Sequence, residues 1–306
     1  MNRQRQRGVA LITALLIFAL LAILGANLTW DNGLDVRRTM TALYHEEGAQ
    51  AVLGAESWVL SLLRDDLQDS ETDHLGELWA QEMPVLPIES DTIQGVLQGG
   101  LEDLQGRFNV NNLVDSEGKA VEEQIEQFQR LLLALGLDPR FAGIAADWID
   151  ADQEPLFPDG AEDSIYSGMV PSYRTPNMPI TSPTELYALD GMNKATMDVL
   201  LPHITALPPL DSGEPTGINV NTATAAVLQS LDDAISAVDA ERLLEERADG
   251  GFAEIENRFA TLVEPEVLNT LVDTSSYFQL KVVVQIANVR ITYFSILQRS
   301  ADGSVA

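Results

Sequence analysis

The sequence contains no cysteine and only three histidines, His45, His74 and His203, which lie far apart in the chain. Without cysteine there is no disulfide framework, no thiol redox site and no thiolate ligand for a metal. A histidine-based metal or catalytic centre would have to be assembled from distant segments. The residue types that build most zinc sites are therefore scarce in this chain.

Basic residues are also scarce, because 18 Lys and Arg stand against 47 Asp and Glu among 306 residues, a net charge of −29. Such a charge repels nucleic acid and anionic lipid headgroups and attracts cations or basic partners. The sequence has no G-x-S-x-G, H-E-x-x-H or Walker loop. Paired carboxylates can hydrolyse sugars, but nothing else in the sequence predicts a cleft. We therefore expect no enzymatic activity.

Charge is absent altogether from one long run, Val9 to Trp30, which has 22 residues. As a helix this run would be about 33 Å long, which matches the hydrocarbon core of a bilayer. A cleaved secretory signal has a shorter apolar region and ends in an A-x-A-like site. Arg3, Arg5 and Arg7 precede the run, and basic residues stay in the cytoplasm. The sequence predicts a single-pass anchor at 9–30, with the rest of the chain on the other side of the membrane.

Helical periodicity continues beyond the anchor, because apolar residues recur at three- and four-residue steps from Val36 to Leu62. This pattern predicts one helix from Val9 to about Asp69. Its first half would span the membrane, and its second half would pack on a globular part.

Strand patterns occur in two segments that lie far apart in the chain. Apolar residues alternate from Phe278 to Ile286, and Ala287–Asn288 is expected to turn the chain into a second strand, Val289 to Gln298. The segment from Thr92 to Leu113 predicts short strands with a hairpin turn at Gly99–Gly100. Because the stretch between these segments is helix-like, we expect an α+β fold in which the long helix packs on a small antiparallel sheet that carries a large inserted helical domain.

The expected boundaries follow from these patterns. They are a leader at 1–8, the N-terminal helix at 9–75 with its transmembrane part at 9–30, the sheet at 76–112 and 276–306, and the inserted α-helical domain at 113–275.

The insert has several helix-start signals. Asn-Val-Asn occurs twice, at Asn109–Asn111 and Asn219–Asn221, and asparagine can cap a helix. Ser182-Pro-Thr-Glu185 combines an N-cap serine, a proline and a glutamate in a capping box. Short helices joined by tight turns predict a helix-hairpin-helix-like bundle.

The stretch from Ile218 to Phe259 resembles the helix-hairpin-helix of membrane-anchored DNA receptors in competence systems. Its turn, Leu231 to Ala240, has no glycine and carries Asp232, Asp233 and Asp239. Carboxylates would repel DNA phosphates. We therefore keep the resemblance in fold, expect no binding of nucleic acid, and retain a DNA receptor as the alternative function.

The segment with most potential for binding chemistry is an acidic loop. Seven carboxylates fall within 17 residues: Asp147, Asp150, Asp152, Glu154, Asp159, Glu162 and Asp163. Pro155, Pro158 and Gly160 interrupt any helix there, so the carboxylates can converge from a loop. Ca²⁺ takes six to eight oxygen ligands in flexible geometry. We expect a subset of the seven to bind Ca²⁺, although the spacing is not that of an EF-hand; the alternative is a solvated acidic loop with no metal.

The junction of leader and anchor is more specific. A short basic leader, Gly8 and a long apolar helix resemble the leader of type IV pilin-like proteins. The resemblance implies that a prepilin peptidase cuts between Gly8 and Val9 and leaves Val9 as an N-methylated N-terminus. The family usually has glutamate at the fifth mature position, where this chain has Thr13.

The chain resembles the K-type minor pseudopilin of type II secretion, the general secretion pathway protein K family. The resemblance lies in the missing glutamate, the length of the chain and the inserted domain. This resemblance implies a place at the tip of the pseudopilus, a role in its assembly, and export of folded proteins from the periplasm across the outer membrane. It implies Ca²⁺ in the inserted domain, a single pass through the inner membrane, and bulk in the periplasm. The implied partners are the I- and J-type minor pseudopilins, the major pseudopilin and the prepilin peptidase; secreted substrates and the outer-membrane secretin are further candidates.

Overall fold

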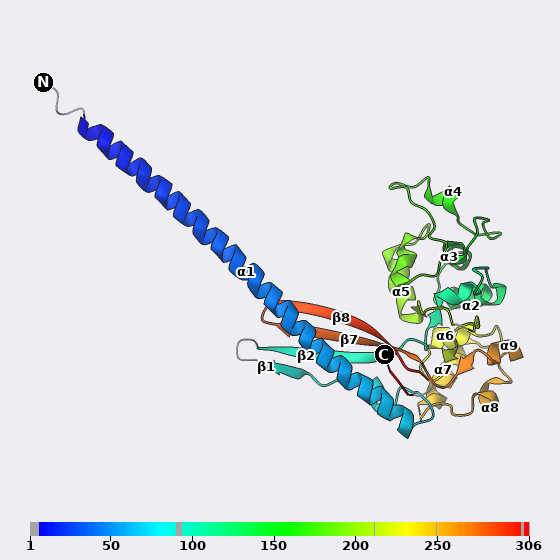
Figure 1. Ribbon diagram of the computed structural model, residues 1–306. Helices are drawn as coiled ribbons and strands as arrows, with labels where there is room; N and C mark the ends of the chain where they lie inside the picture. Colours follow the sequence, from blue (N-terminus) through cyan, green and yellow to red (C-terminus); the bar gives the residue numbers. More distant parts are fainter. Residues whose placement is uncertain (1–5, 90–93, 211, 249, 301–302, 306) are drawn as a thin grey trace. The chain divides into compact units, whose positions relative to one another are not determined.

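The computed structural model describes residues 6–89, 94–210, 212–248, 250–300 and 303–305 (Figure 1). Leader residues 1–5 lie outside the described residues. The chain divides into two compact units. The first comprises Met1–Ala55, Val85–Gln98 and Val283–Thr292, and the second comprises Glu56–Pro84, Gly99–Val282 and Tyr293–Ala306.

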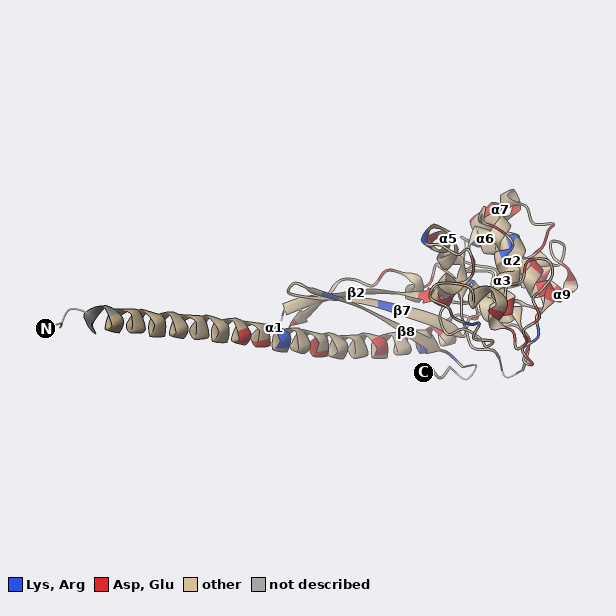
Figure 2. Cartoon of the chain, turned by 90° about the horizontal axis from the view of Figure 1, so that it is seen from above, with Lys and Arg blue, Asp and Glu red and all other residues tan. Residues whose placement is uncertain are grey.

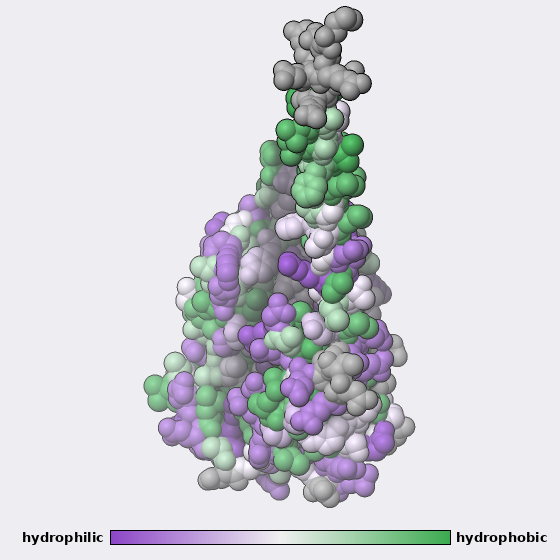
Figure 3. Space-filling view, turned by 90° about the vertical axis from the view of Figure 1, so that its left-hand side faces the viewer, coloured by the Kyte–Doolittle hydropathy of each residue, from purple (hydrophilic) through white to green (hydrophobic). Residues whose placement is uncertain are grey.

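The first element of the described residues is helix α1, Gln6–Asp69, which confirms the predicted long helix. It is long and apolar enough to cross a membrane. Its apolar residues between Val9 and Trp30 are exposed, with Phe18 at 74% and Trp30 at 70%. Figure 2 shows the first part of α1 without charged residues, and Figure 3 shows apolar side chains covering it. Such a surface is stable in lipid and costly in water.

The later turns of α1 are amphipathic. Val52, Ala55, Val59 and Leu63 are buried, with Val59 and Leu63 at 0% exposure. Their three- and four-residue spacing places them on one face of the helix. Within the second unit, the last turns of α1 therefore contribute to a packed core.

The main sheet has four strands in the order β1-β2-β7-β8. They are β1, Leu86–Glu89; β2, Gln94–Asp103; β7, Tyr277–Ile286; and β8, Val289–Gln298. β1 pairs antiparallel with β2, from Leu86 opposite Leu97 to Glu89 opposite Gln94. β7 and β8 are joined by two residues, and Ala287 has a φ of 52°. The two predicted C-terminal strands and their turn are confirmed.

The predicted hairpin turn at Gly99–Gly100 is wrong, because β2 continues through both residues. A Cβ on Gly99 would lie 2.7 Å from the carbonyl oxygen of Lys281, and a Cβ on Gly95 would lie 2.7 Å from that of Gln285. These two glycines allow close approach of a neighbouring strand, which is the other common use of glycine in a sheet.

Between β2 and β7 lie short helices and short strands. In chain order they are β3, Phe108–Asn109; η2, Val110–Leu113; α2, Glu122–Ala134; α3, Phe141–Ile149; α4, Asp163–Tyr166; η3, Pro183–Ala188; α5, Lys194–Leu200; η4, Leu201–His203; β4, Ile204–Thr205; β5, Ile218–Asn219; α6, Ala225–Ser230; α7, Ala237–Arg247; α8, Ile255–Phe259; α9, Pro265–Leu268; and β6, Leu271–Val272. The one-turn helix η1, Leu78–Ala80, precedes β1. β3 pairs in parallel with β4, and β5 pairs in parallel with β6.

The two Asn-Val-Asn motifs start equivalent structures. Asn109 ends β3 and its side chain accepts a hydrogen bond from the backbone N–H of Asn111, at 3.2 Å. Asn219 ends β5 and accepts from the backbone N–H of Asn221 in the same way, at 2.9 Å. The predicted capping role is confirmed for Asn109, which caps η2, whereas Asn219 is followed by a turn and the next helix, α6, is capped by Thr224. Ser182 also forms the predicted capping box, although the helix that follows is a 3₁₀ helix.

This helical region has its own hydrophobic core. Phe108 and Phe128 stack at its centre with ring centroids 5.1 Å apart, and both are fully buried. All nine residues of α3 are buried as well. A helix buried on every side positions its polar residues firmly, and α3 contains one carboxylate.

Candidate metal centre

The acidic loop begins inside a buried helix. Asp147 lies in the last turns of α3, Asp150 directly follows the helix, and Glu162 directly precedes α4. Pro155 and Pro158 cannot continue a helix between them. The chain therefore leaves α3, turns through a loop and returns Glu162 to the two aspartates.

We call Asp147, Asp150 and Glu162 the loop cluster. One carboxylate oxygen from each lies within 4.8 Å of the other two. The three residues are 0%, 3% and 2% exposed. Ionised carboxylates rarely occupy such a place unless they are paired or bind a cation.

Hydrogen bonds hold Asp147 and one oxygen of Glu162, since Oε2 of Glu162 accepts from the hydroxyl of Thr175 at 3.3 Å, and two oxygens of the cluster are left without a partner. Both oxygens of Asp147 accept from the backbone N–H of Leu156, at 3.1 and 3.2 Å. Oδ1 of Asp150 and Oε1 of Glu162 are buried and have no hydrogen-bond partner. A Cβ on Gly160 would lie 2.2 Å from Oδ2 of Asp147, so only glycine lets the loop pass this carboxylate.

Burial raises the pKa of Asp147 and of Asp150 to about 6 and that of Glu162 to about 7. The neighbouring charges that act on the three are other carboxylates, which raise the pKa further. The cluster must therefore take up protons or a cation. Oxygen donors alone favour a hard cation such as Ca²⁺, so the residues fit the predicted ion.

The other four predicted ligands lie outside this convergence. Asp152 and Glu154 are exposed, and Asp159 is half-buried. Asp163 is half-buried and accepts from the backbone N–H and the hydroxyl of Thr175, at 3.0 and 3.1 Å. The structure thus brings together three of the seven predicted residues.

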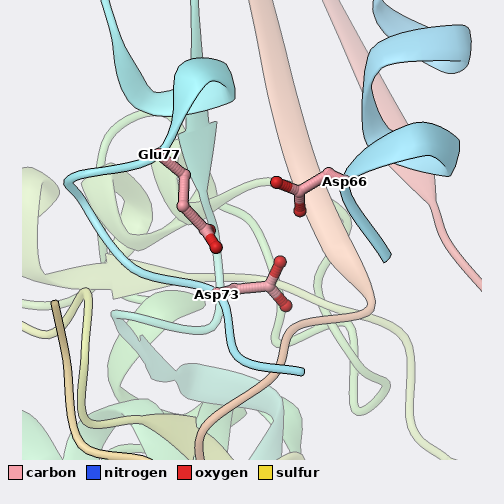
Figure 4. A group of neighbouring side chains, drawn as sticks. All are labelled: Asp66, Asp73 and Glu77. Carbon is pink, nitrogen blue, oxygen red and sulfur yellow. The ribbon is translucent and has the colours of Figure 1, made fainter. Parts of the chain in front are cut away.

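A second carboxylate group was not predicted from the sequence. Asp66, Asp73 and Glu77 have carboxylate oxygens within 4.8 Å of one another (Figure 4). Arg299 lies beside Asp66 and Asp73. We call these four residues the Arg299 cluster. Nη1 of Arg299 lies 3.4 Å from Oδ2 of Asp66, and its Nη2 donates to Asp73. The available signal was acid density, since residues 65–77 contain six carboxylates in 13 positions.

The acidic turn of the helix-hairpin-helix-like region uses its carboxylates for backbone bonds. Asp232 accepts from the N–H groups of Ala234 and Glu264, at 2.9 and 3.1 Å. Asp239 forms a capping box with Ser236 at the start of α7. These aspartates therefore stabilise the turn, and their charge opposes phosphate binding there.

Comparison with known families gives matches over more than half of the chain. Two models described as "Type II secretion system (T2SS), protein K" match residues 106–209 and 218–274. The two matched segments begin at or next to the glycines that precede the two Asn-Val-Asn motifs.

Curated relatives match along almost the whole chain. Type II secretion system protein K of Pseudomonas aeruginosa is 34% identical over 99% of this chain and 92% of the relative. The protein of the same name from Klebsiella pneumoniae is 35% identical over 82% of this chain and 78% of the relative.

A solved structure has the same fold. It is the crystal structure of the GspK-GspI-GspJ complex from the type 2 secretion system of enterotoxigenic Escherichia coli. One chain of that structure matches with a TM-score of 0.75 and 24% identity, over 88% of this chain and 96% of that chain.

Proposed function

Since the chain belongs to the type II secretion system protein K family, we infer that it is a minor pseudopilin that serves protein secretion. The match of two family models and of relatives along nearly the full chain carries this inference. The comparisons give no support to the alternative of a DNA receptor. We propose a structural role in pseudopilus assembly, without catalysis.

The long apolar helix supports a single-pass anchor in the inner membrane. An exposed apolar surface from Val9 to Trp30 and basic residues before it favour an N-terminus in the cytoplasm and bulk in the periplasm. In this arrangement the prepilin peptidase would meet the bond between Gly8 and Val9 on the cytoplasmic side, and Val9 would become the N-methylated terminus.

Thr13 supports a position at the tip of the pseudopilus. Its hydroxyl donates to the carbonyl oxygens of Val9 and Ala10, at 3.1 and 3.0 Å. The side chain is thus satisfied by its own helix. A glutamate in the membrane would need a partner from a further subunit, whereas Thr13 needs none.

The partners we propose follow from the family. The solved relative is a complex of GspK with GspI and GspJ, so we propose that this chain binds the I- and J-type minor pseudopilins. The major pseudopilin would lie below them, and secreted substrates and the outer-membrane secretin are candidate contacts at the tip.

We also propose that the loop cluster binds Ca²⁺. Three buried carboxylates, two of their oxygens without hydrogen-bond partners, and an all-oxygen donor set support this proposal. A bound cation would neutralise the cluster and fix the end of α3 against the start of α4.

Complementation tests the function. Deleting the gene should leave type II substrates in the periplasm, and the wild-type gene should restore their export to the medium. Glu126→Gln, at an exposed carboxylate of α2, is a control that should restore export fully. Normal export in the deletion strain would contradict the function.

Mass spectrometry of the mature chain tests the processing. The chain should begin at N-methylated Val9 in cells with a prepilin peptidase and at Met1 in cells without it. A mature chain that begins beyond Ala26 would contradict the proposal, because it would have lost the anchor.

Thermal unfolding of the full chain in detergent tests the metal. A chelator should lower the melting temperature of the wild-type chain by more than it lowers that of the Asp150→Asn, Glu162→Gln variant. A Ca²⁺ concentration 100-fold above the Kd would stabilise the wild type by about 2.7 kcal/mol. Equal responses of the two chains would rule out Ca²⁺ at the loop cluster.

A further inference from the structure

The Arg299 cluster holds its carboxylates by one oxygen each. Oδ2 of Asp73 accepts from Arg299, and Oδ2 of Asp66 lies 3.4 Å from the same guanidinium. Oε2 of Glu77 accepts from the indole N–H of Trp79, at 2.7 Å. These contacts fix three carboxylates from the end of α1 and from the segment that follows it.

One oxygen in this cluster is buried without a partner. Oε1 of Glu77 has no hydrogen-bond partner, although the Glu77 side chain is only 10% exposed. The nearest basic atom is Nε2 of His74, at 3.7 Å, beyond hydrogen-bond distance. Figure 4 shows the Glu77 carboxylate directed toward the carboxylates of Asp66 and Asp73. The Glu77 side chain thus points an oxygen without a hydrogen-bond partner into a space that two other carboxylates face.

Arg299 does not balance the charge of this cluster. Three carboxylates face one guanidinium. The buried carboxyl of Asp103 lies close by, since it accepts from the hydroxyl of Ser275, whose backbone N–H donates to Asp73. A divalent cation would balance the remaining negative charge.

We propose that the Arg299 cluster is a second cation site, in which Asp66, Asp73 and Glu77 bind a divalent cation with a preference for oxygen ligands, such as Ca²⁺. Arg299 holds two of the ligands from outside, as outer-shell groups commonly do at metal sites. The ion joins the last turn of α1 to the segment before β1. Because Arg299 directly follows β8, the ion also secures the end of that strand.

The site can be tested by terbium luminescence on the full chain in detergent. The loop cluster is first removed with Asp150→Asn and Glu162→Gln. Trp79 contacts Glu77, so excitation of tryptophan should still produce saturable Tb³⁺ emission, and Ca²⁺ should displace the Tb³⁺. Adding Glu77→Gln should raise the Ca²⁺ concentration at which the site is half-saturated by about tenfold or more. Adding Glu126→Gln, a control on the surface of α2, should change nothing.

Each outcome decides the question. If the loop-cluster substitutions abolish the emission, all of the metal binds at the loop cluster. This result would overturn the second site and would leave the proposed Ca²⁺ of the loop cluster intact. Emission unaffected by Glu77→Gln would also overturn it. If Glu77→Gln does not fold, Trp79→Phe in the Asp150→Asn, Glu162→Gln background tests the site, because it removes the tryptophan that excites the Tb³⁺. It should abolish most of the emission, and persistence of the full signal would contradict the site.

Discussion

The loop cluster and the Arg299 cluster both place three carboxylates close together, but they differ in the positive charge that is available to balance them. Both gather three carboxylates within 4.8 Å in the second unit. The Arg299 cluster has a guanidinium from the protein, which is 3% exposed and stacks on Phe278 at 5.0 Å. The charged groups that act on the loop cluster are other carboxylates.

The difference indicates what each cluster needs in order to stay folded. Removing one partner of a buried ion pair leaves an uncompensated charge, which costs far more than an exposed pair gains. The Arg299 cluster should therefore depend mainly on its arginine, and the loop cluster should depend mainly on an ion from solution. The predictions below test this contrast, from the largest expected effect to the smallest.

Arg299→Gln should have the largest effect. It leaves the carboxylates of Asp66 and Asp73 without their guanidinium, and breaking a buried pair costs about 3–5 kcal/mol. Denaturant unfolding of the full chain measures this loss. Arg290→Gln, at an exposed arginine of β8, is the matched control and should change stability by less than about 0.5 kcal/mol. If the two variants lost similar amounts of stability, the Arg299 cluster would not depend on its arginine, and the proposed difference between the clusters would be wrong.

Gly160→Ala should distort the loop cluster. The new Cβ would lie 2.2 Å from Oδ2 of Asp147 and 2.3 Å from the backbone nitrogen of Leu156. Overpacking of this kind costs about 1–3 kcal/mol, and the variant should also lose its response to Ca²⁺. At Gly100 a Cβ meets nothing within 4 Å, so Gly100→Ala is the control. An unchanged Ca²⁺ response in Gly160→Ala would show that the loop does not define the site.

The pH dependence should reveal the loop cluster without any change in Arg299. The folded pKa values of Asp147, Asp150 and Glu162 are raised, so the native state binds more protons than the unfolded chain between about pH 4 and pH 7. Stability in chelator should therefore fall as the pH rises through this window. Ca²⁺ requires the ionised carboxylates, so it should oppose the fall.

Melting temperatures at pH 5 and pH 8, with Ca²⁺ or with chelator, measure this effect. The gap between the two conditions should widen with pH in the wild type. It should be smaller and less dependent on pH in the Asp150→Asn, Glu162→Gln variant. A wild-type gap that narrows as the pH rises would contradict the assignment.

Asp152→Asn should have the smallest effect. Asp152 was one of the seven predicted ligands, but it is exposed, and its carboxylate accepts a hydrogen bond from the backbone N–H of Glu154, at 2.7 Å. We expect a change in stability within about 0.5 kcal/mol. We also expect Ca²⁺ affinity close to that of the wild type. A loss as large as that of Asp150→Asn would place Asp152 among the ligands.

The sequence predicted the elements whose signals are local. The alternation from Phe278 to Ile286 and the turn at Ala287–Asn288 predicted β7 and β8, because a period of two needs no information from elsewhere. Gly99 misled the prediction, because glycine serves both turns and close strand contacts. Which use applies depends on a strand that lies almost 180 residues further along the chain.

The candidate sites also combine features that the local sequence predicts with features that depend on the fold. Acid density predicted the segment of the loop cluster, but the choice of three ligands among seven depends on burial, which tertiary packing decides. The Arg299 cluster escaped prediction because Arg299 lies 222 residues after Glu77. Asp66 lies in the last turn of α1, and Asp73 and Glu77 follow the end of that helix, so only the folded chain brings the three carboxylates together.

Equilibrium dialysis with Ca²⁺ at neutral pH, on the full chain in detergent, tests the central claim most directly. The Asp150→Asn, Glu162→Gln variant should bind one Ca²⁺ fewer per chain than the wild type, and Asp152→Asn should bind as many as the wild type. Equal binding by the wild type and the double variant would contradict the account.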